Sequence, residues 1–209
     1  MSEASDAVVE RLPGRRGQQT RRRLLDATST LLEALPYRDM KVVDIAREAG
    51  TSPATFYQYF ADVEEAVLAI ADEMASAVGP LLASLVTASD WTEDQGWAAS
   101  LRVADGFIAV WEAHRSVLRV IDLATDEGDD RFREVRTRLL GAPAEAFVAV
   151  VHRRSGAAPF ADAGVLVSML AHVAAHREGL EQWGATSAEL RQSLARVILA
   201  TVTGRAAPD

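Results

Sequence analysis

The side chains best suited to contact a ligand lie within one short segment, residues 53–60, which reads Pro-Ala-Thr-Phe-Tyr-Gln-Tyr-Phe. Phe56 and Phe60 are four residues apart, so in a helix they share one face and can anchor it to a neighbouring helix. The polar side chains then face elsewhere: Thr55, Tyr57, Gln58 and Tyr59. Exposed hydroxyl and amide groups suit phosphate oxygens and the base edges of a DNA major groove. The pattern alone is also consistent with a purely structural role, because any small helical hairpin can have buried aromatic anchors and tyrosines at the edge of its core.

Two short helices are predicted to position this segment. Residues 41–49 have apolar side chains at helical spacing, and Gly50 marks the end of that helix. Ser52 and Pro53 then begin the next helix, the serine as a capping hydroxyl and the proline at the first helical position. Two short helices joined by a tight turn predict a helix-turn-helix, with residues 53–60 as its recognition helix.

Positive charge is concentrated around this hairpin. Residues 11–60 carry a net charge of +4, although the whole chain has a formal net charge of −8. Arg21, Arg22 and Arg23 crowd the first turn of a helix predicted over residues 18–35, where the helix dipole disfavours cations. A phosphate partner is one explanation for them. Residues 1–17 are polar and charged and contain Pro13 and two glycines, which predicts a flexible basic arm.

Composition limits the remaining possibilities. A chain of 209 residues with 49% hydrophobic residues can bury a substantial core. It contains no cysteine, which excludes disulfides and thiolate chemistry and suits the cytoplasm. Residues 1–10 carry three acids and no apolar run, and the longest uncharged stretch, residues 74–89, is shorter than the ~20 apolar residues of a membrane span. We therefore expect a cytoplasmic protein without a membrane segment.

The hairpin resembles the helix-turn-helix of the TetR family of repressors. The resemblance rests on residues 43–52, Val-Asp-Ile-Ala-Arg-Glu-Ala-Gly-Thr-Ser, and on residues 55–60, Thr-Phe-Tyr-Gln-Tyr-Phe. It implies a dimer that binds double-stranded operator DNA and a C-terminal region that binds a small effector. The predicted DNA contacts are Arg21, Arg22, Lys41, Ser52, Pro53, Thr55, Tyr57, Gln58 and Tyr59.

Two positions depart from the family pattern. Val63 stands where the family usually has a lysine that reaches a phosphate, and Lys41 stands where it usually has a capping serine or threonine. Lys41 can replace that contact with a charged one and leave Asp39 as a cap, whereas nothing near Val63 compensates. We expect weaker anchoring to the DNA backbone than is usual, or heavier use of the arginines at 15, 16 and 21–23.

The rest of the chain predicts an all-α protein of about nine helices. Residues 18–62 form the three-helix DNA-binding domain and residues 63–209 a helical ligand-binding and dimerisation domain. Capping-box spacing at Asp62 and Glu65 opens a helix that Gly79 and Pro80 are expected to kink. The later helices are predicted over residues 92–114, 116–124, 129–154 with a kink or break at Pro143, 161–182 and 186–202. Capping boxes are predicted at two of their starts, Thr92 with Gln95 and Thr186 with Glu189.

The resemblance implies an effector pocket inside the second domain and a homodimer through the last two helices. Large side chains on helices that should converge are our candidate pocket residues: Trp97, Phe107, Trp111, Phe147, Met169 and His172. Each taken singly is more simply explained as core. Together they favour a largely apolar effector with one or two polar handles. Apolar seams on the last two helices predict the dimer contact, unless they bury into their own subunit: Leu166, Leu170, Val173, Leu190, Leu194, Val197 and Thr201.

Two other classes of function were weighed. A helical-bundle enzyme is disfavoured because no nucleophile, phosphate-loop or dinucleotide motif occurs, and His172 and His176 alone make a poor metal site. We expect no cofactor and no metal. The second class is a helix-turn-helix module that binds a protein, or senses a ligand, with weak or no DNA binding; Val63 is the one feature that favours it.

Overall fold

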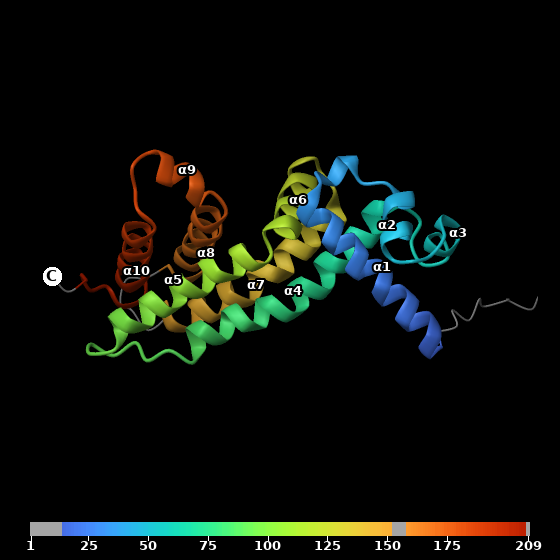
Figure 1. The fold of residues 1–209 in the computed structure, drawn as a ribbon. Helices are drawn as coiled ribbons and strands as arrows, with labels where there is room; N and C mark the ends of the chain where they lie inside the picture. Colours follow the sequence, from blue (N-terminus) through green and yellow to red (C-terminus); the bar gives the residue numbers. More distant parts are fainter. Residues whose placement is uncertain (1–13, 152–157, 208–209) are drawn as a thin grey trace, which may run out of the picture. The chain divides into compact units, whose positions relative to one another are not determined.

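The computed structural model describes residues 14–151 and 158–207, and this part of the chain is all-α, as predicted. It forms ten α-helices and one short 3-10 helix, η1, without a strand (Figure 1). In chain order the elements are α1 (Arg15–Ala34), η1 (Tyr37–Asp39), α2 (Val42–Glu48), α3 (Pro53–Phe56), α4 (Val63–Thr87), α5 (Gly96–Ala113), α6 (Arg115–Asp126), α7 (Asp130–Val151), α8 (Pro159–Ala175), α9 (Arg177–Gln182) and α10 (Ser187–Thr203).

Several helix starts follow the local sequence. Thr186 and Glu189 form the predicted capping box of α10. The backbone N–H and the hydroxyl of Thr186 donate to the Glu189 carboxylate, and these bonds lower the pKa of that carboxyl group. At α4, Asp62 Oδ1 accepts the N–H of Glu65 at 2.8 Å, also as predicted. Side-chain capping therefore sets both starts.

Other boundaries were predicted wrongly. The first helix begins at Arg15, because the carbonyl of Gly14 already accepts the N–H of Gln18 at 3.0 Å. The last three residues of the predicted flexible arm are therefore helical, while residues 1–13 lie outside the described part. The expected cap at Thr92 is also absent, since the Thr92 N–H donates to Asp90 at 2.9 Å and α5 begins four residues later.

The structure has ten α-helices where about nine were expected, because one predicted helix is divided. His176 leaves the helical conformation with φ −112° and ψ 19°, which ends α8 and separates it from α9. Its ring Nδ1 lies 3.0 Å from the carbonyl oxygen of His172. Pro80 and Pro143 do not break their helices, which continue through both residues.

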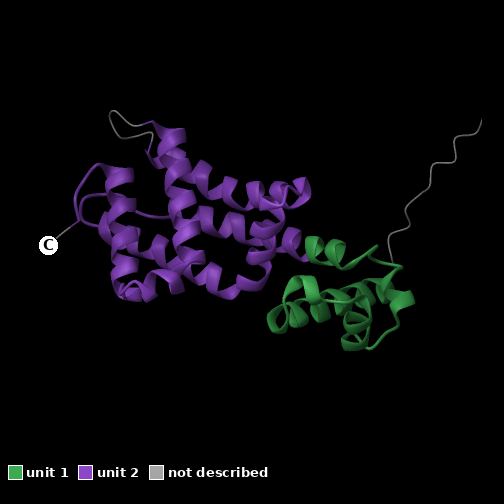
Figure 2. Ribbon diagram, turned by 90° about the horizontal axis from the view of Figure 1, so that it is seen from above, with its two compact units in different colours: residues 1–69 green, residues 70–209 purple. Residues whose placement is uncertain are grey.

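The chain divides into two compact units, residues 1–69 and 70–209 (Figure 2). In the first unit α2 packs on α1 and α3 packs on α2, around fully buried Leu24, Ile45 and Phe56. In the second unit α5 lies between α10 and α8, and α7 packs on both α6 and α8.

Close backbone contact and ion pairs fix the helices of the second unit. A Cβ atom on Gly79 of α4 would lie 3.2 Å from the carbonyl oxygen of Leu139 in α7, so a side chain at residue 79 would require the two backbones to separate slightly. Arg191 of α10 binds both carboxylate oxygens of Asp105 in α5, with Nη2 2.7 Å from Oδ2. This hydrogen bonding raises the pKa of Arg191.

The residues of the apolar seams predicted on the last two helices differ in burial. Leu166, Leu170 and Leu194 have no more than 3% of their surface exposed. Val173, Leu190 and Thr201 are half-buried, and Val197 is exposed. Val165, which the sequence reasoning did not select, is also exposed.

Helix α4 is long and apolar enough to cross a membrane by length and composition alone. A core helix of a soluble protein passes the same test, and Leu82 and Val86 of α4 are completely buried within the protein. Its apolar character is accounted for by this internal packing.

We predict that Leu82→Ala lowers the free energy of unfolding by about 2–5 kcal/mol, because it leaves a cavity at a fully buried position. The adjacent Leu81 is 53% exposed, and Leu81→Ala is the matched control with an expected change within about 0.5 kcal/mol. Urea unfolding followed by circular dichroism measures both. Equal losses for the two variants would contradict the packing described for α4.

Candidate nucleic-acid interface and ligand cavity

The turn between α2 and α3 is built by Gly50, whose φ of 63° lies in the left-handed region that favours glycine. The N–H of Gly50 donates to Arg47 at 3.1 Å, and the N–H of Thr51 donates to Ala46 at 2.8 Å. These bonds close the end of α2 and reverse the chain within a few residues. The predicted helix-turn-helix is therefore present.

Helix α3 is shorter than predicted. Ser52 caps it by accepting the N–H of Thr55 at 3.1 Å, and the two hydroxyl oxygens are 3.0 Å apart. The α-helix ends at Phe56, and residues 57–59 continue as turns. In that segment Gln58 N donates to the Thr55 carbonyl at 3.2 Å, a tighter bonding pattern than that of an α-helix.

Two phenylalanines hold this segment against the first unit. Phe56 is fully buried and Phe60 is 3% exposed, with their ring centroids 5.6 Å apart. Tyr57, between them, is 59% exposed and meets the Phe56 ring edge-on at 5.8 Å. Burial of the phenylalanines thus turns the tyrosine outward.

The predicted DNA contacts differ in exposure. Exposed residues are Arg22, Lys41, Ser52, Pro53, Tyr57 and Gln58, and half-buried ones are Arg21, Thr55 and Tyr59. The Arg21 guanidinium carbon lies 5.5 Å from the centroid of the Phe60 ring, a cation–π contact. Arg22 pairs with Asp26 at 2.9 Å. Both arginines therefore also make intramolecular contacts.

Lys41 and Tyr57 line one hollow of about 670 Å³ in the first unit. Val63, the position that departs from the family pattern, lines the same hollow. Sequence reasoning did not select the other polar groups there, Arg38 and Glu64, because they belong to neighbouring elements outside the hairpin motif. Lys41 directly precedes α2 as its N-cap residue, and no side chain caps this helix start. The Lys41 side chain is exposed to solvent.

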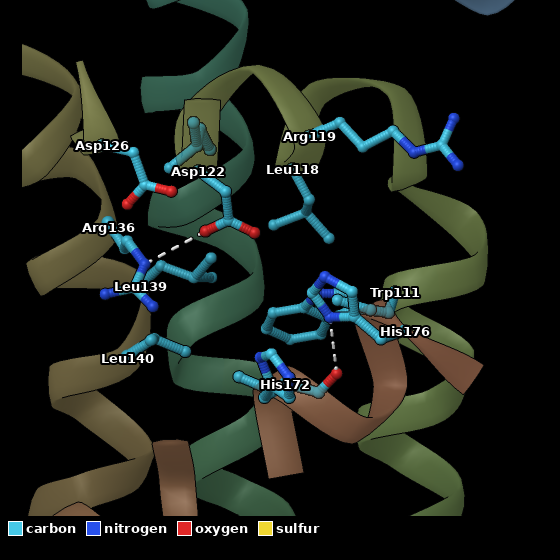
Figure 3. Close-up of a pocket in the computed structure, with 13 residues that line it drawn as sticks. Trp111, Leu118, Arg119, Asp122, Asp126, Arg136, Leu139, Leu140, His172 and His176 are labelled. Carbon is cyan, nitrogen blue, oxygen red and sulfur yellow. Dashed lines mark hydrogen bonds and ion pairs between the residues drawn. The ribbon is translucent and has the colours of Figure 1, made fainter. Parts of the chain in front are cut away.

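The second unit contains a cavity of about 520 Å³ bounded by α5, α6, α7 and the end of α8 (Figure 3). Its lining combines apolar and ionisable side chains: Trp111, Leu118, Arg119, Ile121, Asp122, Asp126, Arg136, Leu139, Leu140, Ala171, His172, Ala175 and His176.

Of the six residues predicted to bind a ligand, Trp111 and His172 line this cavity. Phe107 and Phe147 are fully buried in the core, and Trp97 and Met169 are half-buried away from the lining. The sequence reasoning looked for large apolar groups and so missed the acids of α6. The spacing of Asp122 and Asp126, one helical turn apart, was the available signal.

The charged side chains of the cavity are not equivalent. Arg136 Nε donates to Asp122 Oδ1 at 3.1 Å, while the Arg119 side chain points away from the other lining residues (Figure 3). The pKa of the exposed Glu178 is lowered mainly by the hydrogen bond and charge of Arg115, and to a smaller extent by the charge of Arg119.

The aromatic side of the cavity holds an unsatisfied donor. Trp111 is 6% exposed, and its indole Nε1 is buried without a hydrogen-bond partner in the described part of the chain. His172 and His176 stack with ring centroids 4.2 Å apart. Among the described residues no group of three potential ligands could hold a metal ion, so the histidines are treated as part of the cavity wall.

Comparison with known families gives two adjoining matches. Residues 24–70 match the family described as bacterial regulatory proteins, tetR family. Residues 82–209, more than half of the chain, match the family described as tetracyclin repressor-like, C-terminal domain. Together these segments cover both compact units.

Individual proteins agree with these matches. The transcriptional regulator EthR of Mycobacterium tuberculosis is 31% identical over 124 residues, which are 56% of this chain and 55% of EthR. A crystal structure of a TetR-family regulator from Mesorhizobium loti has a TM-score of 0.70 at 22% identity and covers 90% of this chain and 97% of its own. FadR of Bacillus subtilis, in complex with stearoyl-CoA, has a TM-score of 0.65 at 13% identity and covers 88% and 98%. The two structural likenesses establish a shared fold.

Proposed function

The chain belongs to the TetR family of bacterial regulatory proteins, and from this premise we propose that it is a repressor that leaves its operator when a small effector binds. The family resemblance predicted from the hairpin is thereby confirmed, and so is the expectation of a DNA-binding regulator and not an enzyme. The observation that carries the proposal is the exposed Tyr57 between two buried phenylalanines, which presents a polar recognition surface. We expect it to act in the cytoplasm.

We propose that the operator is palindromic and that a homodimer reads it. A two-fold dimer would place two copies of α3 about one DNA turn apart, ~34 Å, or a multiple of that distance. Each copy would enter the major groove, where Tyr57 and Gln58 contact base edges or phosphates and Lys41 contacts the backbone.

We place the dimer contact on the outer faces of α8 and α10, which pack against each other. Val165 of α8 is 70% exposed and Val197 of α10 is 42% exposed. Small exposed residues surround them and would allow close approach of a second copy: Ala161, Gly164, Ser168, Ser193 and Ala200.

The effector site in this proposal is the cavity of the second unit. FadR of Bacillus subtilis binds stearoyl-CoA within the same fold, which supports a site for a small molecule in this domain. Effector binding would favour a conformer with a different separation of the recognition helices, and DNA affinity would fall by the factor with which the effector discriminates between conformers.

We predict that Tyr57→Ala weakens operator binding about 10- to 100-fold, because a base or phosphate contact is lost at an exposed position. The probe is a DNA fragment selected from random sequences by the purified chain, and binding is measured by mobility shift at several salt concentrations. Tyr57→Phe separates the hydroxyl contact from the ring contact. If the native chain retards no selected DNA at low salt, or binds with no salt dependence, the repressor proposal fails in favour of a protein-interaction module.

Val63→Lys is expected to raise affinity for the same DNA several-fold at low salt, because it restores a cation beside Lys41 and Tyr57 in one hollow. The slope of log affinity against log salt should steepen by about one unit. Val63→Gln, similar in length but uncharged, is the control and should leave the slope unchanged. Equal gains for both variants would show that charge at this position contributes nothing.

Trp111→Phe should weaken effector-induced release from DNA while leaving the affinity of the effector-free protein within about threefold, since Trp111 lines the cavity and not the DNA-binding hollow. A thermal-shift screen of hydrophobic metabolites supplies the effector. Trp97→Phe, at a half-buried position outside the cavity lining, is the matched control. Release that depends on Trp97 instead would place the effector site elsewhere.

A further inference from the structure

We infer that the cavity of the second unit binds a ligand with a protonated amine on an apolar body. The inference rests on the proposed function, because it specifies the chemistry of the effector site. Its basis is the pairing of the two aspartates and two arginines that line the cavity, Asp122, Asp126, Arg119 and Arg136.

One acidic side chain of the cavity is already neutralised. Asp122 accepts a hydrogen bond from Arg136 Nε at 3.1 Å, and this ion pair joins α6 to α7. Because its guanidinium is engaged with Asp122, Arg136 is not a free cation for an anionic ligand.

The second acidic side chain has no such partner. Asp126 lies one helical turn beyond Asp122 on α6, and no hydrogen bond or ion pair joins its carboxylate to another described residue. The remaining arginine of the lining, Arg119, points away from the other lining residues (Figure 3), and its charge lowers the pKa of Glu178. The cavity therefore contains one carboxylate without a matching cation, which favours a positively charged ligand group.

The apolar side chains of the lining suit an apolar ligand body. Leu118, Ile121 and Leu139 are nearly or completely buried there, and Leu140 is half-buried. A volume of about 520 Å³ lies within the range of sites for small organic ligands. Asp126 is exposed, so it stands at the rim, where an amine can remain partly hydrated while its chain is buried.

Trp111 supplies a second, independent indication that the cavity receives a ligand. Its indole N–H is buried without an acceptor in the described part of the chain, and such a donor is rarely left unpaired. An acceptor on the ligand body could satisfy it after the neighbouring side chains move. A carboxylate ligand would satisfy this donor too, but it would meet the unpaired charge of Asp126, so the amine defines the ligand class.

The test uses three probes with the same apolar chain: octylamine, octanol and octanoate. Isothermal titration at low salt with the full chain is expected to show octylamine binding about tenfold more tightly than octanol, as for one charged hydrogen bond, with octanoate weakest. Raising the salt concentration should reduce the advantage of the amine, because Asp126 is exposed.

Asp126→Asn is expected to bring the affinity for octylamine to that for octanol and to leave octanol binding unchanged. Asp94→Asn, at an exposed carboxylate in the turn before α5, is the matched control and should retain the preference. Retained melting temperature confirms that both variants are folded.

Three results would overturn the inference: octanol or octanoate binding as tightly as octylamine, no effect of Asp126→Asn on the preference, or no binding of any of the three. The proposed function is tested separately by release from selected DNA. Preferential binding of octylamine without DNA release would support the amine site and overturn its role as the effector site.

Discussion

Complete burial of Phe56 is the interaction on which the recognition surface depends. Helix α3 has only four residues, too few to be stable through its own hydrogen bonds. Its position is therefore set by the packing of Phe56 and Phe60 and by the Ser52 cap at its first turn. Because Tyr57 directly follows Phe56, the same burial determines which way the exposed polar groups face.

The second unit contains a cavity within a packed helical domain. Ion pairs join the helices of this unit, such as Asp105 with Arg191 between α5 and α10 and Asp122 with Arg136 between α6 and α7. Around the cavity itself the packing is incomplete, and a buried indole N–H is left without an acceptor. A domain built only for stability would normally satisfy or remove such a donor.

Local sequence signals predicted the fold well wherever one side chain determines the outcome. The Thr186–Glu189 box, the Ser52 cap and the glycine turn after α2 each occur as predicted. Boundaries set by competing partners were missed: Asp90 takes the Thr92 N–H, and His176 divides α8 from α9. Pro143 was expected to kink or break its helix, and α7 continues through it without a break.

The candidate sites could be predicted to different degrees. Most of the candidate DNA contacts lie in one contiguous segment, residues 52–59, so their spacing alone brings them together. The cavity draws its lining from α5 to α8, and which faces converge depends on long-range packing that no local pattern records. Large apolar residues such as Phe107 and Phe147 consequently proved to be core, whereas the cavity holds acids that a search for apolar groups passes over.

The close approach of α4 and α7 has a mechanical consequence. Leu139 lines the cavity with its side chain, and its carbonyl oxygen lies where a Cβ atom on residue 79 would be only 3.2 Å away. No side chain stands between the two backbones there to absorb a displacement. The backbone of α4 at Gly79 therefore limits how far α7 can move toward it at Leu139, so this part of the cavity wall is supported by backbone and not by a side chain that could change rotamer.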